Sequence, residues 1–198
     1  QLLKTREGGA WESHDEEDHS EHHHSNFDPH LWLDPQNART IVQIIASVLS
    51  ESDPANKDHY QKNAASIDRK LLRLTEEVQS TLGPVQNVPY IVFHDAFQYF
   101  EHRFKTNAVG SFTVDPSRLP GARRLYEVRR RIVDTRTRCV FKEPQVNSKL
   151  VASVTEGTSA RIATLDPLGA ALVPGPNAYF QLIRNIADTI RDCGASAQ

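Results

Sequence analysis

The sequence predicts an α/β protein with a mostly parallel four-stranded sheet, flanking helices, and a long rigid helix ahead of this lobe. Two observations predict this class. Beyond residue 84, short apolar runs alternate with helical segments, as they do in βαβ units. Before that point, residues 54–82 carry one apolar stripe at helical spacing, too long for an ordinary connection.

The bulk composition excludes several classes of protein. The 198 residues are 38% hydrophobic and include no long apolar run, so no transmembrane helix is expected. A formal charge of −2 gives no reason to expect nucleic acid as a partner. The chain contains no methionine, so we expect Gln1 to follow a removed segment or to begin a fragment.

Residues 1–26 form the most biased part of the chain, because 12–24 hold five histidines and six acidic residues without lysine or arginine. Such a tract cannot bury a core and predicts a flexible loop. A solvated acidic loop and a tag remnant are the alternatives to weak, multivalent metal binding. We favour metal binding because imidazoles and carboxylates together suit zinc. The histidines are His14, His19, His22, His23 and His24.

The segment 27–53 begins with FDPHLWLDP and continues as a helix to about residue 51. Asp34 is suited to cap this helix and Pro35 to occupy its first position. His30 therefore lies in a rigid, proline-bounded stretch, where a histidine is either structural or a ligand. The apolar side chains that share one face of the helix are Ile41, Ile44, Ile45, Val48 and Leu49.

The segment 54–83 predicts a linker helix. Asp53 and Pro54 are again suited to the cap and the first position of a helix, and Gly83 with Pro84 ends it. At 1.5 Å per residue it would span ~42 Å, which suits a rigid strut between two lobes or a coiled-coil partner. Its stripe consists of Tyr60, Ala64, Ile67, Leu71, Leu74, Val78 and Leu82.

The remaining segment, 84–198, predicts a compact α/β lobe. Its apolar periodicity alternates between strand and helix with no internal repeat and no glycine-rich phosphate loop. The expected strands are 89–93, 107–112, 138–141 and 160–165, and the expected helices lie near 96–104, 121–134, 148–156 and 177–192.

Three of the expected strands end in a potential metal ligand. His94, Glu143 and Asp166 follow the first, third and fourth strands, whose carboxyl ends meet at one edge of a parallel sheet. Asp166 can instead cap a turn before Pro167, and Glu143 can instead pair with an arginine. His94 and Asp166, with His30 from across the strut, make a nitrogen and oxygen set that suits zinc.

The two cysteines bear on the compartment of the protein, and the catalytic motifs bear on its chemistry. Cys139 and Cys193 are either buried free thiols of a cytosolic protein or a disulfide formed outside the cytosol. Neither the helical zinc-hydrolase motif nor a nucleophile elbow occurs, so we do not expect an enzyme.

Four motifs in this order resemble the periplasmic zinc-binding component of high-affinity zinc ABC importers, the ZnuA type. They are DPHLWL at 28–33, VFHDAFQYF at 92–100, CVF with EPQ between 139 and 145, and TLDPLG at 164–169. With the His-rich tract, the resemblance extends over residues 12–193. It implies zinc capture and delivery to an ABC permease in the inner membrane.

The resemblance also implies roles for individual residues. His30 and His94 correspond to zinc ligands, and Asp166 to an aspartate ligand of the wider family. Relatives that carry manganese tend to have a carboxylate in place of His94, and imidazole suits zinc better. Cys139 and Cys193 correspond to a disulfide, and the His-rich tract to a loop over the metal cleft that collects zinc.

One departure from the family is large, since its members have an N-terminal lobe with a further ligand histidine. We therefore expect this chain to be a C-terminal portion, with 27–53 as the remnant of that lobe and one metal ligand missing. Dimerisation of the shortened chain through an exposed helix stripe stays open. The alternative functions are a manganese or iron carrier of the same fold, a zinc hydrolase and an adhesion protein.

Overall fold

The computed structural model describes residues 2–6, 27–114 and 120–195. Its centre is a four-stranded sheet of parallel strands in the order β2-β1-β3-β4. The predicted α/β class with a parallel sheet is therefore confirmed. The strands are β1 (Pro89–His94), β2 (Asn107–Thr113), β3 (Cys139–Lys142) and β4 (Arg161–Thr164).

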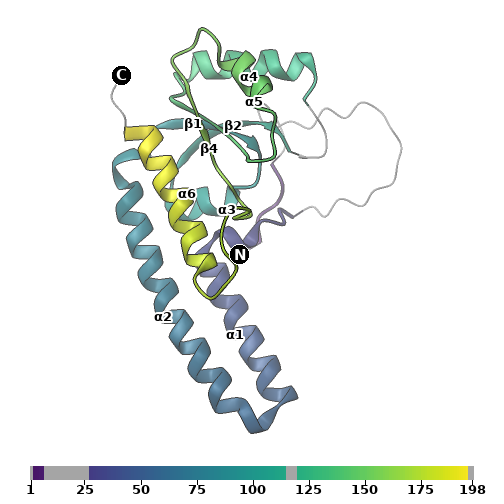
Figure 1. The fold of residues 1–198 in the computed structure, drawn as a ribbon, viewed down its shortest axis with the longest axis vertical. Helices are drawn as coiled ribbons and strands as arrows, with labels where there is room; N and C mark the ends of the chain where they lie inside the picture. The colour runs from purple at the N-terminus through teal and green to yellow at the C-terminus, as the bar shows by residue number, and fades with distance from the viewer. Residues whose placement is uncertain (1, 7–26, 115–119, 196–198) are drawn as a thin grey trace, which may run out of the picture.

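Helices cover the sheet, and a helical hairpin of α1 and α2 extends away from it (Figure 1). Every helix expected from the sequence is present, with ends that differ by a few residues. The helices are α1 (Pro35–Ser52), α2 (Lys57–Leu82), α3 (Gln98–Phe104), α4 (Ala122–Asp134), α5 (Ser148–Thr155) and α6 (Ala178–Ala195). Short 3-10 turns are η2 (Leu31–Leu33), η3 (Pro54–Asn56) and η4 (Gly83–Val85).

Strand β1 shows why both faces of the sheet are covered. Tyr90 and Val92 belong to the core that α2, α3 and α6 complete, and Ile91 and Phe93 belong to the core under α4 and α5. All four side chains are at most 3% exposed. Because successive side chains of a strand point to opposite faces, an unbroken apolar run predicts a strand buried on both sides.

The starts of the two hairpin helices differ. The Asp34 carboxylate accepts a hydrogen bond from the Gln36 amide at 2.8 Å, with Pro35 in the first turn, so the predicted cap of α1 is confirmed. The Asp53 carboxylate instead accepts hydrogen bonds from the side chains of Asn56 and Tyr60. As a result Pro54 begins the turn η3, and α2 starts at Lys57.

Helix α2 packs against both α1 and α6, with α6 beside its upper part and α1 beside its lower part in Figure 1. At 1.5 Å per residue its 26 residues span about 39 Å. The part of its stripe nearest the sheet, from Leu71 to Leu82, is buried, whereas Ile67 is 37% exposed. The strut is thus anchored at one end by α6, to which an ion pair between Glu77 and Arg184 also attaches it.

The predicted apolar face of α1 is on the outside of the molecule. Ile44, Ile45 and Val48 are 51–58% exposed and Leu49 is 40% exposed. The smaller Ala38 and Val42 face the core instead, and Ala46 is buried. This helix is apolar around most of its circumference, so periodicity alone did not identify the side that packs.

Among the helices of the described segments, none combines the length and the hydropathy that a membrane span requires.

Cys139 at the start of β3 and Cys193 in the last turn of α6 form a disulfide with their Cα atoms 6.0 Å apart. The pairing implied by the family resemblance is confirmed. Both side chains are buried, at 1% and 7% exposure, and the bond closes a sequence separation of 54 residues. It therefore ties the C-terminal helix to the centre of the sheet.

Replacing both cysteines by serine is expected to lower the free energy of unfolding by about 2–4 kcal/mol, since the unfolded chain regains the freedom that the closed loop removes. Urea denaturation of both proteins, with and without reductant, measures the loss. Reductant should destabilise the unsubstituted chain by a similar amount and leave the serine variant unchanged. Equal stability of the two oxidised proteins would contradict the expectation.

Candidate metal centre

The structure places His30 and His94 against each other. Their ring centroids are 4.8 Å apart with the planes at 65°. His94 is the last residue of β1 and His30 directly precedes η2, so the two rings come from segments 64 residues apart in the chain. Both side chains are largely buried, with 8% and 14% exposure. Two imidazoles at van der Waals distance provide a pair of nitrogen atoms that can act as metal ligands.

Each imidazole is oriented by a buried carboxylate. Nδ1 of His94 lies 3.0 Å from Oε1 of Glu143, and Nδ1 of His30 lies 2.7 Å from Oδ1 of Asp28. A carboxylate accepts only, so Nδ1 carries the proton that each ring donates, and in a neutral imidazole the lone pair is then on Nε2. Within the described parts of the chain, neither Nε2 atom has a hydrogen-bond partner. Outer-shell carboxylates of this kind are typical of histidines that bind zinc.

Three contacts fasten the His30 segment to the lobe that carries His94. The Trp32 indole donates to the Pro167 carbonyl at 3.2 Å, and the Tyr179 hydroxyl donates to the Trp32 carbonyl at 2.8 Å. Arg103 of α3 donates twice to the Asp34 carboxylate, at 2.7 and 2.9 Å. Hydrogen bonds therefore hold the segment that carries His30 against the lobe that carries His94.

Asp166 closes a turn, as the sequence allowed, whereas Glu143 contacts His94 and not an arginine. Its second oxygen accepts a hydrogen bond from Gln145 at 2.7 Å, which holds the carboxylate against His94. The Asp166 carboxylate accepts hydrogen bonds from the backbone amides of residues 168, 169 and 170, at 2.6–3.0 Å. In this arrangement it closes the turn after β4.

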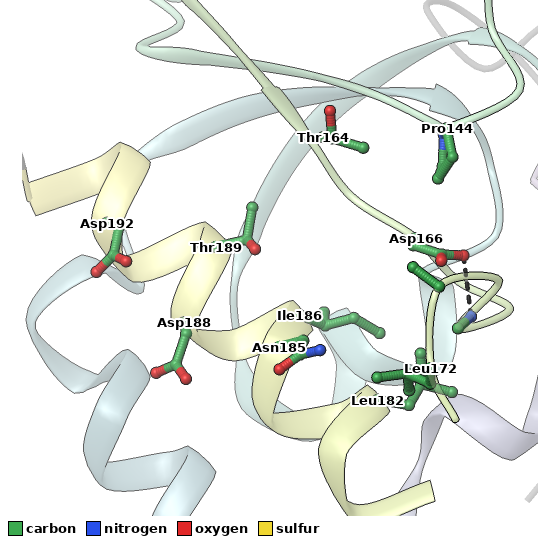
Figure 2. A pocket seen from close by; sticks show the side chains of 12 residues that line it. Pro144, Thr164, Asp166, Leu172, Leu182, Asn185, Ile186, Asp188, Thr189 and Asp192 are labelled. Atoms are coloured by element: carbon green, nitrogen blue, oxygen red, sulfur yellow. Dashed lines mark hydrogen bonds between the residues drawn. The ribbon is translucent and has the colours of Figure 1, made fainter. Parts of the chain in front are cut away.

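Asp166 also lines a pocket between this turn and α6 (Figure 2). The other polar residues around the pocket include Thr164, Asn185 and Asp188, and neither of the two histidines is among the lining residues. Across the described residues, no group of three histidine, cysteine, aspartate or glutamate side chains is arranged to hold a metal. The structure thus brings together His30 and His94 but not Asp166.

A buried ionic network adjoins the histidine pair. Arg6 forms an ion pair with Glu101 of α3 and lies 3.4 Å from Asp95, the residue after His94. Burial raises the pKa of Asp95 to about 6 and the pKa of Glu101 to about 7, although the single Arg6 charge opposes both shifts. Oδ1 of Asp95 and Oε1 of Glu101 are buried without a hydrogen-bond partner. One guanidinium therefore serves two carboxylates.

Sequence reasoning missed this network, because residues 1–26 were predicted only as a flexible loop. In the structure Lys4 forms a β-bridge with Phe27, and the Leu3 carbonyl accepts from the Asp28 amide at 2.9 Å. The Leu3 amide donates to the Tyr99 hydroxyl at 3.0 Å. The local sequence offers one signal for this network. Tyr99 and Glu101 follow His94 within a stretch of polar and aromatic residues.

The histidines of the acidic tract, His14, His19, His22, His23 and His24, lie outside the described residues. The two segments that flank this tract are described and lie side by side, since Lys4 pairs with Phe27. Arg6 on one side contacts Asp95, and Asp28 on the other side holds His30. The described segments on either side of the tract therefore adjoin the histidine pair.

The raised pKa of Glu101 predicts how stability depends on pH. Between its ordinary value of 4.5 and about 7, the folded protein keeps a proton that the unfolded chain releases. The free energy of unfolding should consequently fall as the pH rises through this window. Asp95 acts in the same sense between 3.8 and about 6.

Glu101→Gln should remove the Glu101 share of this dependence. Relative to the unsubstituted protein, the variant is expected to gain up to about 3 kcal/mol between pH 4.5 and 7.5, because one pKa unit corresponds to about 1.4 kcal/mol. Urea denaturation at a series of pH values measures the gain. Glu76→Gln, at an exposed position of α2, is the matched control. Parallel stability curves for the Glu101 variant and the unsubstituted protein would show the expectation to be wrong.

The fold and the paired histidines define an α/β protein with a candidate transition-metal site at the carboxyl edge of its sheet. Residues 2–193 match the family model described as ZnuA, the periplasmic component A of the zinc-uptake complex. The chain belongs to the ZnuA family. It is 46% identical to the high-affinity zinc uptake system protein ZnuA of Brucella abortus over 96% of this chain and 65% of that protein.

Solved structures share the fold of this chain. A mutant of the laminin-binding adhesin Lmb of Streptococcus agalactiae superposes with a TM-score of 0.79 and 26% identity, covering 98% of this chain and 67% of that one. The zinc-bound E280Q variant of AdcAII from Streptococcus pneumoniae gives a TM-score of 0.70 and 29% identity, with 84% and 62% covered. The chain thus spans about two-thirds of the length of these relatives.

Proposed function

We propose that this chain is the zinc-binding part of a periplasmic solute-binding protein, which captures zinc ions and delivers them to an ABC-type permease in the inner membrane. The observation that carries the proposal is the His30–His94 pair, with each Nδ1 bonded to a buried carboxylate. Family membership and the names of the relatives, which include a zinc uptake protein and a zinc-bound structure, support it. The proposed role is binding and not catalysis.

Zinc is the proposed cargo, held by Nε2 of both histidines. Imidazole is a borderline-soft ligand and favours zinc over manganese, for which carboxylates are better suited. We propose Asp166 as a further ligand, which requires its carboxylate to leave the backbone amides of the turn after β4. Water or another donor then completes the four positions that zinc prefers.

A competition titration tests the identity of the metal. The chain is titrated with zinc, manganese and ferrous iron in turn against a metal-binding dye, and each bound metal is then challenged with the others. Zinc is expected to displace both rivals at equal concentration. Preferential retention of manganese or iron would make the chain a carrier of that metal. Ester or phosphate turnover lost in Asp166→Asn would favour a zinc hydrolase.

Glu143→Gln should weaken zinc binding by roughly 10–100-fold, the usual effect of losing an outer-shell carboxylate. The amide keeps the size of the side chain but removes the charge that makes Nε2 of His94 more basic. Dye competition gives the zinc affinity, and thermal unfolding of the metal-free variant checks the fold. Gln145 donates only to Oε2 of Glu143, the oxygen that does not contact His94, so Gln145→Ala should have a smaller effect. An unchanged affinity in Glu143→Gln would exclude a role for this carboxylate.

The histidines of the acidic tract are proposed as a secondary, weak zinc-collecting site. Deleting residues 12–24 should reduce the number of weakly bound zinc ions and leave the tightest site unchanged. Equilibrium dialysis over a range of zinc concentrations measures both. Loss of the tightest site in the deletion variant would instead place a required ligand in the tract.

Self-association of the chain through the exposed face of α1 is a separate proposal. Ile44, Ile45, Val48 and Leu49 form a row of exposed aliphatic side chains that a second copy of the helix can cover. Sedimentation equilibrium should show a concentration-dependent dimer that Ile45→Asp abolishes. A monomer at all concentrations would refute it.

Laminin binding, suggested by the name of the adhesin relative, is tested by direct binding to immobilised laminin.

A further inference from the structure

Tyr99 of α3 is buried, yet it belongs to neither of the two apolar cores that the described residues form. From this part of the chain, the larger core takes Phe97, Phe100 and Phe104. The hydroxyl of Tyr99 instead contacts two backbone groups, since it accepts from the Leu3 amide at 3.0 Å and donates to the Asp28 carbonyl at 3.1 Å. A tyrosine hydroxyl has one proton to donate, and an amide can only donate, so that proton goes to Asp28.

Asp28 is held at both of its backbone groups. Its amide donates to the Leu3 carbonyl at 2.9 Å, and its carbonyl accepts from Tyr99. Its side chain contacts the proposed ligand, because Oδ1 accepts from the His30 amide at 2.9 Å and lies 2.7 Å from Nδ1 of the same residue. One carboxylate oxygen makes both of these contacts. A shift of the Asp28 backbone would therefore displace the backbone and the ring of His30 together.

The N-terminal segment that reaches Asp28 is itself held by α3. Beside the contact made by Tyr99, the Gln98 side-chain amide donates to the Lys4 carbonyl at 3.0 Å. Helix α3 follows β1 within a few residues, so the stretch of chain that carries His94 also supplies the support for His30. This support fixes one imidazole relative to the other.

We propose that Tyr99 is a positioning residue of the metal centre, which fixes His30 relative to His94 through Asp28; its effect on zinc binding rests on the proposed function. The side chains of a binding site must be held within about 0.5 Å of the productive geometry, and outer-shell groups do much of this holding. A hydroxyl that does not touch the metal can in this way set the affinity for it.

A general contribution to the stability of the fold is the competing role for Tyr99, because loss of any buried hydroxyl leaves its partners unsatisfied. Tyr90 provides the comparison. Both tyrosines are 2% exposed, and Tyr90 belongs to the strand that ends in His94. The hydroxyl of Tyr90 lies 2.7 Å from Oγ1 of Thr106. Tyr90→Phe therefore removes a buried hydroxyl close to the site and leaves the support of Asp28 in place.

Zinc affinity is measured by chelator competition for the unsubstituted chain, Tyr99→Phe, Asp28→Ala and the double variant. Tyr99→Phe keeps the ring and should weaken zinc binding by about 3–10-fold, less than the roughly 10–100-fold expected for an outer-shell partner such as Asp28. Since Tyr99 acts through Asp28, its substitution should cause no further loss on the Asp28→Ala background. Tyr90→Phe should leave the zinc affinity unchanged.

A second readout uses the metal-free chain. Nitrogen-15 NMR at alkaline pH reports which nitrogen of each neutral imidazole carries the proton. In Tyr99→Phe, the tautomer with the proton on Nδ1 should become less populated for His30 and stay unchanged for His94, whose partner Glu143 is untouched. Thermal unfolding shows whether each variant folds. If Tyr99→Phe does not fold, Gln98→Ala, at a half-buried position, replaces it, and a smaller shift of the same tautomer is expected.

Four results would overturn the inference. They are an unchanged zinc affinity in Tyr99→Phe, an unchanged His30 tautomer in this variant or its replacement, equal changes in Tyr90→Phe, and a further loss of affinity when Tyr99→Phe is added to Asp28→Ala. If the chain does not bind zinc tightly but the His30 tautomer shifts as expected, Tyr99 still positions His30 and the proposed function alone fails. Tight zinc binding with an unchanged tautomer would leave the proposed function standing and refute the positioning role.

Discussion

His94→Ala is expected to abolish the tight zinc site, with a loss of affinity larger than the roughly 10–100-fold that follows removal of an outer-shell partner. The variant loses one of two nitrogen donors and leaves the Glu143 carboxylate without its imidazole partner. Water can occupy the vacant position, but it is a weaker ligand for zinc than imidazole. His30→Ala should have an effect of the same order, because the two rings have equivalent carboxylate partners.

The zinc affinity is measured by competition with a chelator of known affinity. His59→Ala, an exposed histidine of α2, removes an imidazole of equal chemistry and should leave the tight site unchanged. Thermal unfolding of each metal-free variant separates a lost ligand from a lost fold. A His94→Ala protein that keeps its tightest site would refute the assignment of the site to this pair of histidines.

Arg6→Met is expected to lower the free energy of unfolding by about 3–5 kcal/mol, the usual result of removing one partner from a buried ion pair. Arg6 is 18% exposed, and its partners Asp95 and Glu101 are only 7–8% exposed. Without the guanidinium, both carboxylates must either ionise in an apolar environment or take up protons. Either outcome destabilises the folded state relative to the unfolded chain.

Urea denaturation at pH 8 measures this loss, because the unfolded chain is then fully ionised at both carboxyl groups. The double variant Arg6→Met, Glu101→Gln should recover part of the stability, since one of the two buried charges is gone. Arg69→Met, at an exposed position of α2, is the matched control and should change stability little. A loss below about 1 kcal/mol in Arg6→Met would mean that the segment before residue 7 does not stabilise the lobe.

The sequence by itself determined the elements of the lobe and the order in which they follow each other. The apolar run of β1, the stripe of α2 and the cap formed by Asp34 depend on a residue and its near neighbours, so periodicity and capping rules predict them. The same rules placed His94 at the carboxyl end of a strand. Motif resemblance added the disulfide between Cys139 and Cys193, whose pairing no local pattern specifies.

Only the tertiary structure decided which side chains contact each other. Glu143 reaches His94 across 49 residues and Arg6 reaches Glu101 across 95. Such contacts depend on how the strands and helices pack, and no local pattern encodes that packing. Asp166 shows the same limit of sequence-based prediction. Its place after the fourth strand was predicted, but the conformation of the turn after β4 decided which backbone amides its carboxylate binds. Helix α1 was likewise predicted as a helix, and packing against α2 decided that its larger aliphatic side chains lie outside.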